Sequence, residues 1–101
     1  MKKLPERLKI GGHWYEISQV ANLEYERGVR ADISHIPKII QIDVAAPLGD
    51  SRTSEILLHE IIHGVNWVYN DNALDEETVS RLTEGLYQVF RDNELYFGDD
   101  E

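Results

Sequence analysis

The chain has 101 residues, no cysteine and a formal net charge of −9, which suits one domain with a modest core and excludes disulfides. The acidic balance argues against nucleic-acid binding through a basic face, and no stretch reaches the roughly 18 apolar residues of a transmembrane helix. Since the basic N-terminus lacks the apolar region of a secretion signal, we expect a cytoplasmic protein that binds neither nucleic acid nor membrane.

Residues 1–49 are predicted to be mostly β-structure. Two runs with apolar alternation, RLKI at 7–10 and HWYEISQV at 13–20, flank a two-glycine turn, which is typical of a β-hairpin. Two further runs, GVRADI at 28–33 and KIIQIDV at 38–44, are separated by a segment containing proline. These runs predict a small antiparallel or mixed sheet of three to four strands, while residues 21–28 fit a strand or a loop equally well.

Residues 50–93 are predicted to be mostly helical, followed by an acidic tail at 94–101. Asp50 or Ser51 can cap a helix that runs to about residue 69. A second helix begins near Asp75, which suits an N-cap, and continues to about residue 93. The whole chain is therefore predicted to be one α+β domain, with a sheet first, an active-site helix next and a C-terminal glutamate helix last.

The stretch ILLHEIIHGVNW places two histidines and a glutamate in an apolar run. On a helix, His59 and His63 lie one turn apart on one face and can hold one Zn²⁺ ion together. Glu60 can reach a water molecule beside the metal, which is the logic of the H-E-x-x-H metallopeptidase signature. The neighbouring apolar residues surround the helix on most sides and predict a buried central helix: Ile56, Leu57, Leu58, Ile61, Ile62, Val65 and Val68.

A catalytic zinc site needs a third protein ligand. No further histidine follows shortly after His63, so a carboxylate from the second helix is the expected ligand, and that helix offers Glu76, Glu77 and Glu84. Glu76 shares a face with apolar positions, whereas Glu77 shares a face with charged ones. We therefore predict Glu76 as the ligand and keep Glu77 as the alternative.

The runs TSEILLHEIIHGVNW and LDEETVSRLTEGLYQVFRDNE together resemble small phage- and prophage-type proteins with an H-E-x-x-H motif, the minimal gluzincins. The resemblance implies that His59, His63 and Glu76 bind zinc and that Glu60 is the general base. It also implies that Ser80, four places after the glutamate ligand, supports the site. It further implies an edge strand before the helix that pairs with substrate, for which residues 38–44 are the candidate.

These observations predict a zinc metallopeptidase that acts on a peptide or protein substrate, with a water molecule activated by Glu60. The alternative is a zinc-containing module that binds peptides or regulates a partner with little or no turnover. In that case the tail at 94–101 can fold across the cleft and keep the chain latent.

Overall fold

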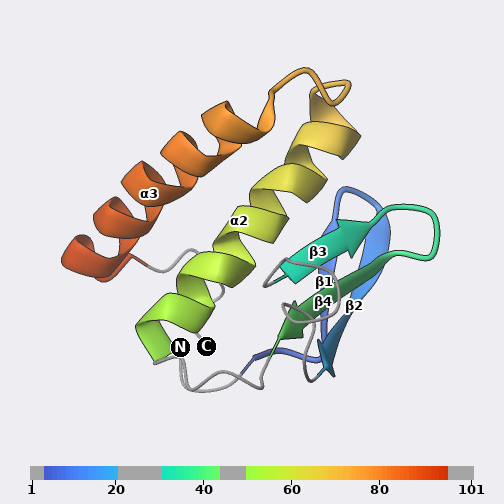
Figure 1. Ribbon diagram of the computed structural model, residues 1–101, viewed down its shortest axis with the longest axis horizontal. Helices are drawn as coiled ribbons and strands as arrows, with labels where there is room; N and C mark the ends of the chain where they lie inside the picture. The colour runs from blue at the N-terminus through green and yellow to red at the C-terminus, as the bar shows by residue number, and fades with distance from the viewer. Residues whose placement is uncertain (1–3, 21–30, 44–49, 96–101) are drawn as a thin grey trace.

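The structure is a computed structural model that describes residues 4–20, 31–43 and 50–95, without the side chains of residues 50 and 51 (Figure 1). A four-stranded mixed sheet precedes two long helices, which confirms the predicted α+β fold. The elements in chain order are β1 (Arg7–Ile10), β2 (His13–Val20), β3 (Ala31–Ser34), β4 (Ile39–Asp43), α2 (Asp50–Tyr69) and α3 (Glu76–Asn93). The predicted cap depends on the side chains of Asp50 and Ser51, which the structure does not describe, and residues 21–28 and the tail from residue 96 lie outside the described residues.

The β1–β2 hairpin forms where turn chemistry and alternation predicted it. The strands pair antiparallel across the turn, in which Gly11 adopts a φ of +64° that side-chain-bearing residues rarely take. Alternation then separates the two faces of β2, because Tyr15 is 1% exposed while Trp14 is 47% exposed. Arg7 stacks its guanidinium over the outer Trp14 ring at 4.2 Å.

The order of the described strands is β1-β2-β4-β3, with β4 parallel to β2 and antiparallel to β3. The prediction that residues 38–44 form the edge strand is therefore wrong, since β4 has a hydrogen-bonded neighbour on both sides. Its isoleucines explain its position: Ile40 and Ile42 are 0% exposed, as expected for an interior strand. Among the described strands, β3 is the edge on that side of the sheet.

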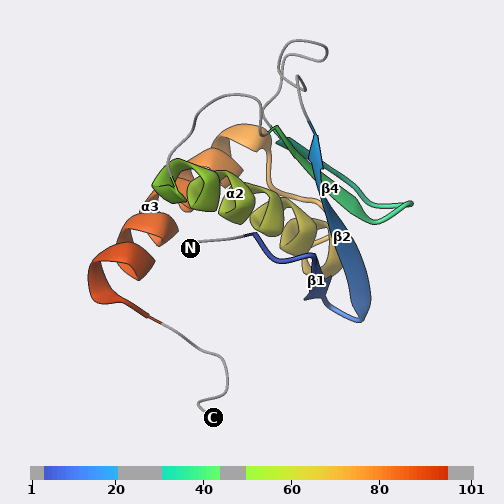
Figure 2. The same cartoon turned by 90° about the horizontal axis from the view of Figure 1, so that it is seen from below.

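The core lies between one face of the sheet and α2, as Figures 1 and 2 show. Tyr15, Ile40 and Ile42 from the sheet meet Leu57 from the helix. The prediction that α2 is apolar and buried on most sides is only partly correct, because Val65 is 42% exposed. The helix packs against the sheet with one side and against α3 with another, and Trp67 on α2 is also 49% exposed.

Gly64, directly after the second motif histidine, allows α2 to approach the sheet closely. A Cβ atom at this position would lie 2.7 Å from Ile10 Cδ1 and 3.2 Å from Ile33 Cδ1. A larger residue would therefore require the Ile10 and Ile33 side chains to move.

Helix α3 packs on α2 through its first turns. Asp75 is the N-cap, and its side chain accepts a hydrogen bond from the Thr78 amide at 2.8 Å, as predicted. Val79 is 0% exposed, but later apolar residues at helical spacing along α3 are 38–43% exposed: Leu82, Leu86 and Val89. Neither described helix is long and apolar enough to cross a membrane.

Candidate metal centre

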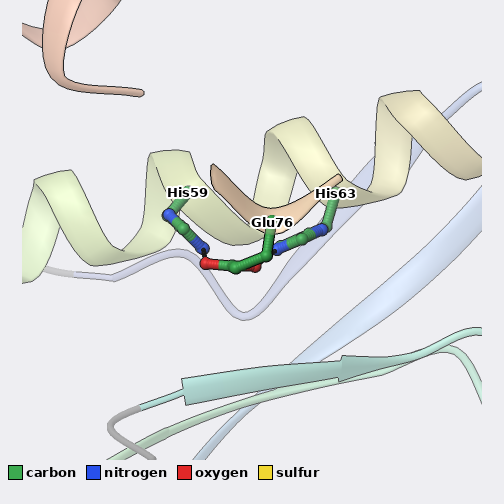
Figure 3. A group of neighbouring side chains, drawn as sticks. All are labelled: His59, His63 and Glu76. Carbon is green, nitrogen blue, oxygen red and sulfur yellow. Dashed lines mark hydrogen bonds and ion pairs between the residues drawn. The ribbon is translucent and has the colours of Figure 1, made fainter. Parts of the chain in front are cut away.

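Three side chains converge between α2 and the first turn of α3 (Figure 3). His59 Nε2 lies 2.9 Å from Glu76 Oε2, and His63 Nε2 lies 2.7 Å from Glu76 Oε1. The two imidazoles and the carboxylate can each offer one ligand atom, and these atoms lie within 4.8 Å of one another. The group could therefore hold one metal ion.

Helical spacing brings these residues together. His59 and His63 are one turn apart on α2, with ring centroids 4.8 Å apart. Among the three glutamates considered from the sequence, the structure places only Glu76 in this group. Glu77 instead turns outward and forms an ion pair with Arg81 at 2.8 Å, while Glu84 lines the neighbouring hollow.

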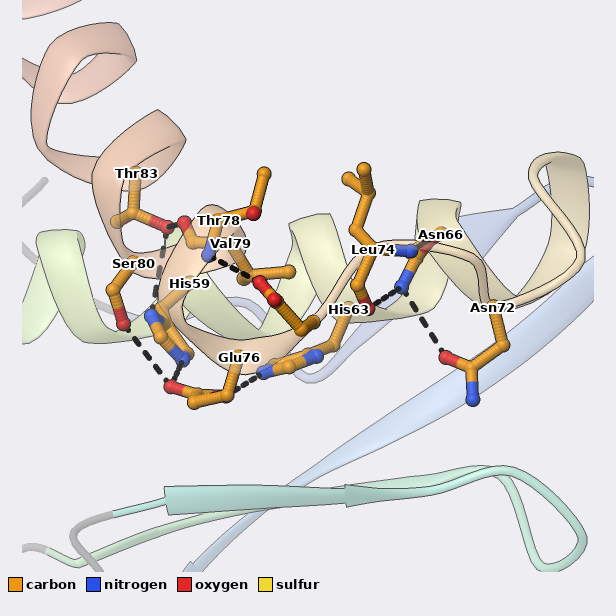
Figure 4. Close-up of polar contacts among 11 residues, drawn as sticks. His59, His63, Asn66, Asn72, Leu74, Glu76, Thr78, Val79, Ser80 and Thr83 are labelled. Carbon is orange, nitrogen blue, oxygen red and sulfur yellow. Dashed lines mark hydrogen bonds and ion pairs between the residues drawn. The ribbon is translucent and has the colours of Figure 1, made fainter.

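Asn66, which the sequence analysis did not single out, connects the two halves of the centre (Figure 4). This residue of α2 is 2% exposed, and its side chain bonds the loop that leads into α3. Its Nδ2 donates to Asn72 Oδ1 and to the Leu74 carbonyl, and its Oδ1 accepts from the Leu74 amide and from Asn70 Nδ2, at 3.0–3.2 Å. The loop therefore has a fixed path, and Glu76 follows two residues after it.

Two hydroxyl groups of α3 contact the candidate ligands and orient their side chains (Figure 4). Ser80 Oγ donates to Glu76 Oε2 at 3.1 Å, at the position that the resemblance singled out. Thr83 Oγ1 lies 3.5 Å from His59 Nδ1 and donates its own proton to the Val79 carbonyl at 2.8 Å. Because that proton is engaged, Thr83 can accept a hydrogen bond from Nδ1–H, and with a metal ion bound this would leave the lone pair on Nε2, which otherwise donates to Glu76.

Glu60 lies in the most unusual electrostatic environment of the described residues. Its side chain points from the same helix into the protein and is 6% exposed. Burial, followed by the negative charges of Asp32 and Glu76, raises the pKa of its carboxyl to about 8. No hydrogen bond to it occurs among the described residues, so its charged form is poorly compensated.

Glu76 is the electrostatic opposite, with a side chain that is 65% exposed. Partial burial raises the pKa of its carboxyl, but His59, His63 and Ser80 together outweigh this effect and leave the pKa below its usual value. The carboxylate is therefore ionised at neutral pH, which is the form that ligates a metal.

The group opens into two adjoining hollows of about 370 and 380 Å³. Both are lined by Ala31 of β3 and by His59, Glu60 and Glu76. The edge strand β3 therefore forms one wall of the cleft, in the place that the sequence analysis gave to residues 38–44.

The chemistry of the donors suits a transition-metal ion. Two imidazole nitrogens and one carboxylate form a common protein set for zinc, with further positions open toward a cleft. Comparisons with protein-family models, with curated proteins and with solved structures found no match.

Proposed function

We propose that this protein is a zinc-dependent peptidase of the minimal gluzincin type. His59, His63 and Glu76 would hold the ion, because they are the residues whose ligand atoms converge. When bound, zinc supplies Lewis acidity, which polarises a carbonyl group and makes water more acidic.

The observation that carries the proposal is the carboxyl group of Glu60. It is buried and lines both hollows beside the three ligands, and in the metal-free chain its pKa is raised to about 8. A structural metal site has no use for an uncompensated carboxyl group at this position, whereas a general base must lie beside the water that it deprotonates.

The roles of the protein groups follow from this arrangement. Glu60 would accept a proton from water on a carboxylate oxygen and later give it to the leaving amine. With the ion bound, Thr83 would keep the His59 lone pair on the nitrogen that faces the cleft, and Ser80 would hold Glu76 in place. The wall formed by β3 would align an extended peptide along the cleft.

The test is Glu60→Gln beside wild type, with zinc content measured by elemental analysis and hydrolysis followed with fluorescently labelled casein. We expect both proteins to bind about one zinc ion per chain and only wild type to hydrolyse casein. Glu84→Gln, which removes another carboxylate of the same cleft, is the control and should remain active.

Two results would contradict the proposal. Equal hydrolysis by Glu60→Gln would remove the role assigned to Glu60. Zinc-loaded wild type without turnover on casein would favour a peptide-binding module instead.

A further inference from the structure

The cleft continues past the proposed metal ligands along α2. The hollow beside the ligands is also lined by His35, the residue that follows β3. His35 in turn lines a further hollow of about 240 Å³ together with His13, Tyr15, Lys38, Trp67 and Val68. Trp67 lies one helical turn beyond His63, so this second hollow extends the cleft along the same side of the helix.

The two ends of this cleft differ in charge. The hollow on the far side of the ligands is lined by Glu55 and Glu84, and its Arg52 pairs with Glu55 at 3.4 Å. Of the residues that the structure describes, those lining the end near His35 offer one ammonium group and two imidazoles and no carboxylate. In a chain with a net charge of −9, such a lining is opposite to the average surface.

Contacts with Trp67 and Tyr15 fix the orientation of the His35 ring at this hollow. It stacks on Trp67 with ring centroids 4.3 Å apart and an angle of 5° between the planes. Its Nδ1 lies 3.2 Å from the hydroxyl of Tyr15, a residue that is 1% exposed. One ring nitrogen is thus engaged with the core, and no other hydrogen bond to this ring occurs in the described part of the chain.

Lys38 supplies the positive charge from a backbone conformation that a lysine seldom adopts. It lies in the β3–β4 turn with a φ of +59°, where glycine or asparagine is the usual residue. The other described non-glycine residues with positive φ are Asp71 and Asn72, which tolerate this region, and Glu94, the C-cap of α3. The turn therefore holds Lys38 in a backbone conformation that asparagine or glycine would adopt more readily.

We propose that His35, Lys38 and His13 form a carboxylate-binding subsite that fixes one end of a peptide lying across the metal centre. The proposal rests on the proposed function, because it assigns the substrate class of the same cleft. The carboxylate belongs either to the C-terminus of the peptide or to an acidic side chain, and both offer the same acceptor oxygens to the Lys38 ammonium and the His35 N–H.

The experiment measures binding without turnover. Zinc-loaded Glu60→Gln is used in a Trp14→Phe background, so that Trp67, stacked on His35, is the remaining tryptophan and reports occupancy by fluorescence. The probes are acetylated heptapeptide pools with Glu or Gln at one defined position, each made with a free C-terminal carboxylate and as the amide. Lys38→Asn removes the charge but suits positive φ, and Lys9→Gln removes a charge from the exposed β1 surface as the matched control.

We expect peptides with a carboxylate at the preferred position to bind about tenfold more tightly than their uncharged matches. Lys38→Asn should reduce this preference to about threefold or less, and adding His35→Phe should remove it, while Lys9→Gln should keep it. Loss of the preference on amidation identifies the C-terminal carboxylate, and loss on Glu to Gln replacement identifies an acidic side chain.

The absence of any carboxylate preference, or a preference that Lys38→Asn and His35→Phe leave intact, would overturn the subsite. Because binding is measured in the Glu60→Gln protein, a retained preference with no hydrolysis by wild type would contradict the peptidase and leave the subsite standing.

Discussion

The middle of α2 and the first turn of α3 each contribute one carboxyl group to the centre. Their surroundings shift the pKa values of the two groups in opposite directions. Glu60 on α2 is 6% exposed and its pKa is raised to about 8. Glu76 on α3 is bonded by two imidazoles and a hydroxyl, and its pKa is lowered. The same side chain thus suits proton transfer in one region and metal ligation in the other, because its surroundings differ.

The largest expected effect separates Glu76 from its neighbour Glu77. Glu76→Gln should lower zinc affinity by more than about a hundredfold, since even the loss of groups that only orient ligands costs 10- to 100-fold. Glu77→Gln should leave the affinity unchanged, because Glu77 pairs with Arg81. Competition with a chelating dye measures both. Equal losses in the two variants would contradict the assignment of the ligand.

The second prediction concerns pH and the metal-free protein. The Glu60 pKa is about 8 in the folded state and near 4.5 when unfolded, so folding favours the protonated form. The contribution of Glu60 to the free energy of unfolding is therefore full below about pH 4.5 and is lost as the pH rises to 8. At pH 8.5, Glu60→Gln should be more stable than wild type by on the order of 4–5 kcal/mol.

Urea unfolding in the presence of a chelator checks this at pH 5 and pH 8.5. The two proteins should differ little at pH 5. A constant difference at both pH values would mean that burial does not hold the Glu60 proton.

Asn66 tests how the first turn of α3 is placed. Asn66→Asp keeps the shape of the side chain but replaces the two donors of Nδ2 by a charge, which should cost about 1–3 kcal/mol of folding free energy. Zinc affinity should fall about tenfold as Glu76 loses its fixed position. Asn93→Asp, at an exposed residue whose side chain donates to the Val89 carbonyl, is the control. Unchanged zinc affinity in folded Asn66→Asp would show that Glu76 is placed by other contacts.

The smallest effect compares a glycine in each helix. Gly85 on α3 has nothing within 4 Å of a built Cβ, so Gly85→Ala should stabilise the protein by about 0.5–1 kcal/mol. Gly64→Ala on α2 gains the same propensity but meets Ile10 and Ile33, and it should destabilise by about 1 kcal/mol. Thermal unfolding measures the pair. Increased thermal stability in both variants would mean that α2 is packed as loosely at Gly64 as α3 is at Gly85.

The parts of the fold that depend on neighbours in the chain could be predicted from the sequence. The hairpin followed from its two glycines and the α3 start from Asp75. The place of β4 could not be predicted, because its parallel pairing with β2 joins segments about twenty residues apart and leaves no local signal.

The candidate site divides in the same way. Motif spacing singled out His59 and His63, and helical periodicity distinguished Glu76 from Glu77. Asn66 was missed, although a polar residue in an apolar helix three places after His63 was a signal. Thr83 gave no signal, since its contact with His59 depends on how the two helices cross.

The proposed ligands are close in the sequence, since His63 and Glu76 are only 13 positions apart. An ion bound by them would act as a short cross-link between α2 and α3, and closing so small a loop removes little chain entropy. Its stabilising effect would instead come from mass action on the two helices that supply the ligands. None of the proposed ligands lies on a strand, and the sheet is packed by buried isoleucines that do not depend on the ion. Chelation is therefore expected to release α3 from α2 before it disturbs the strands.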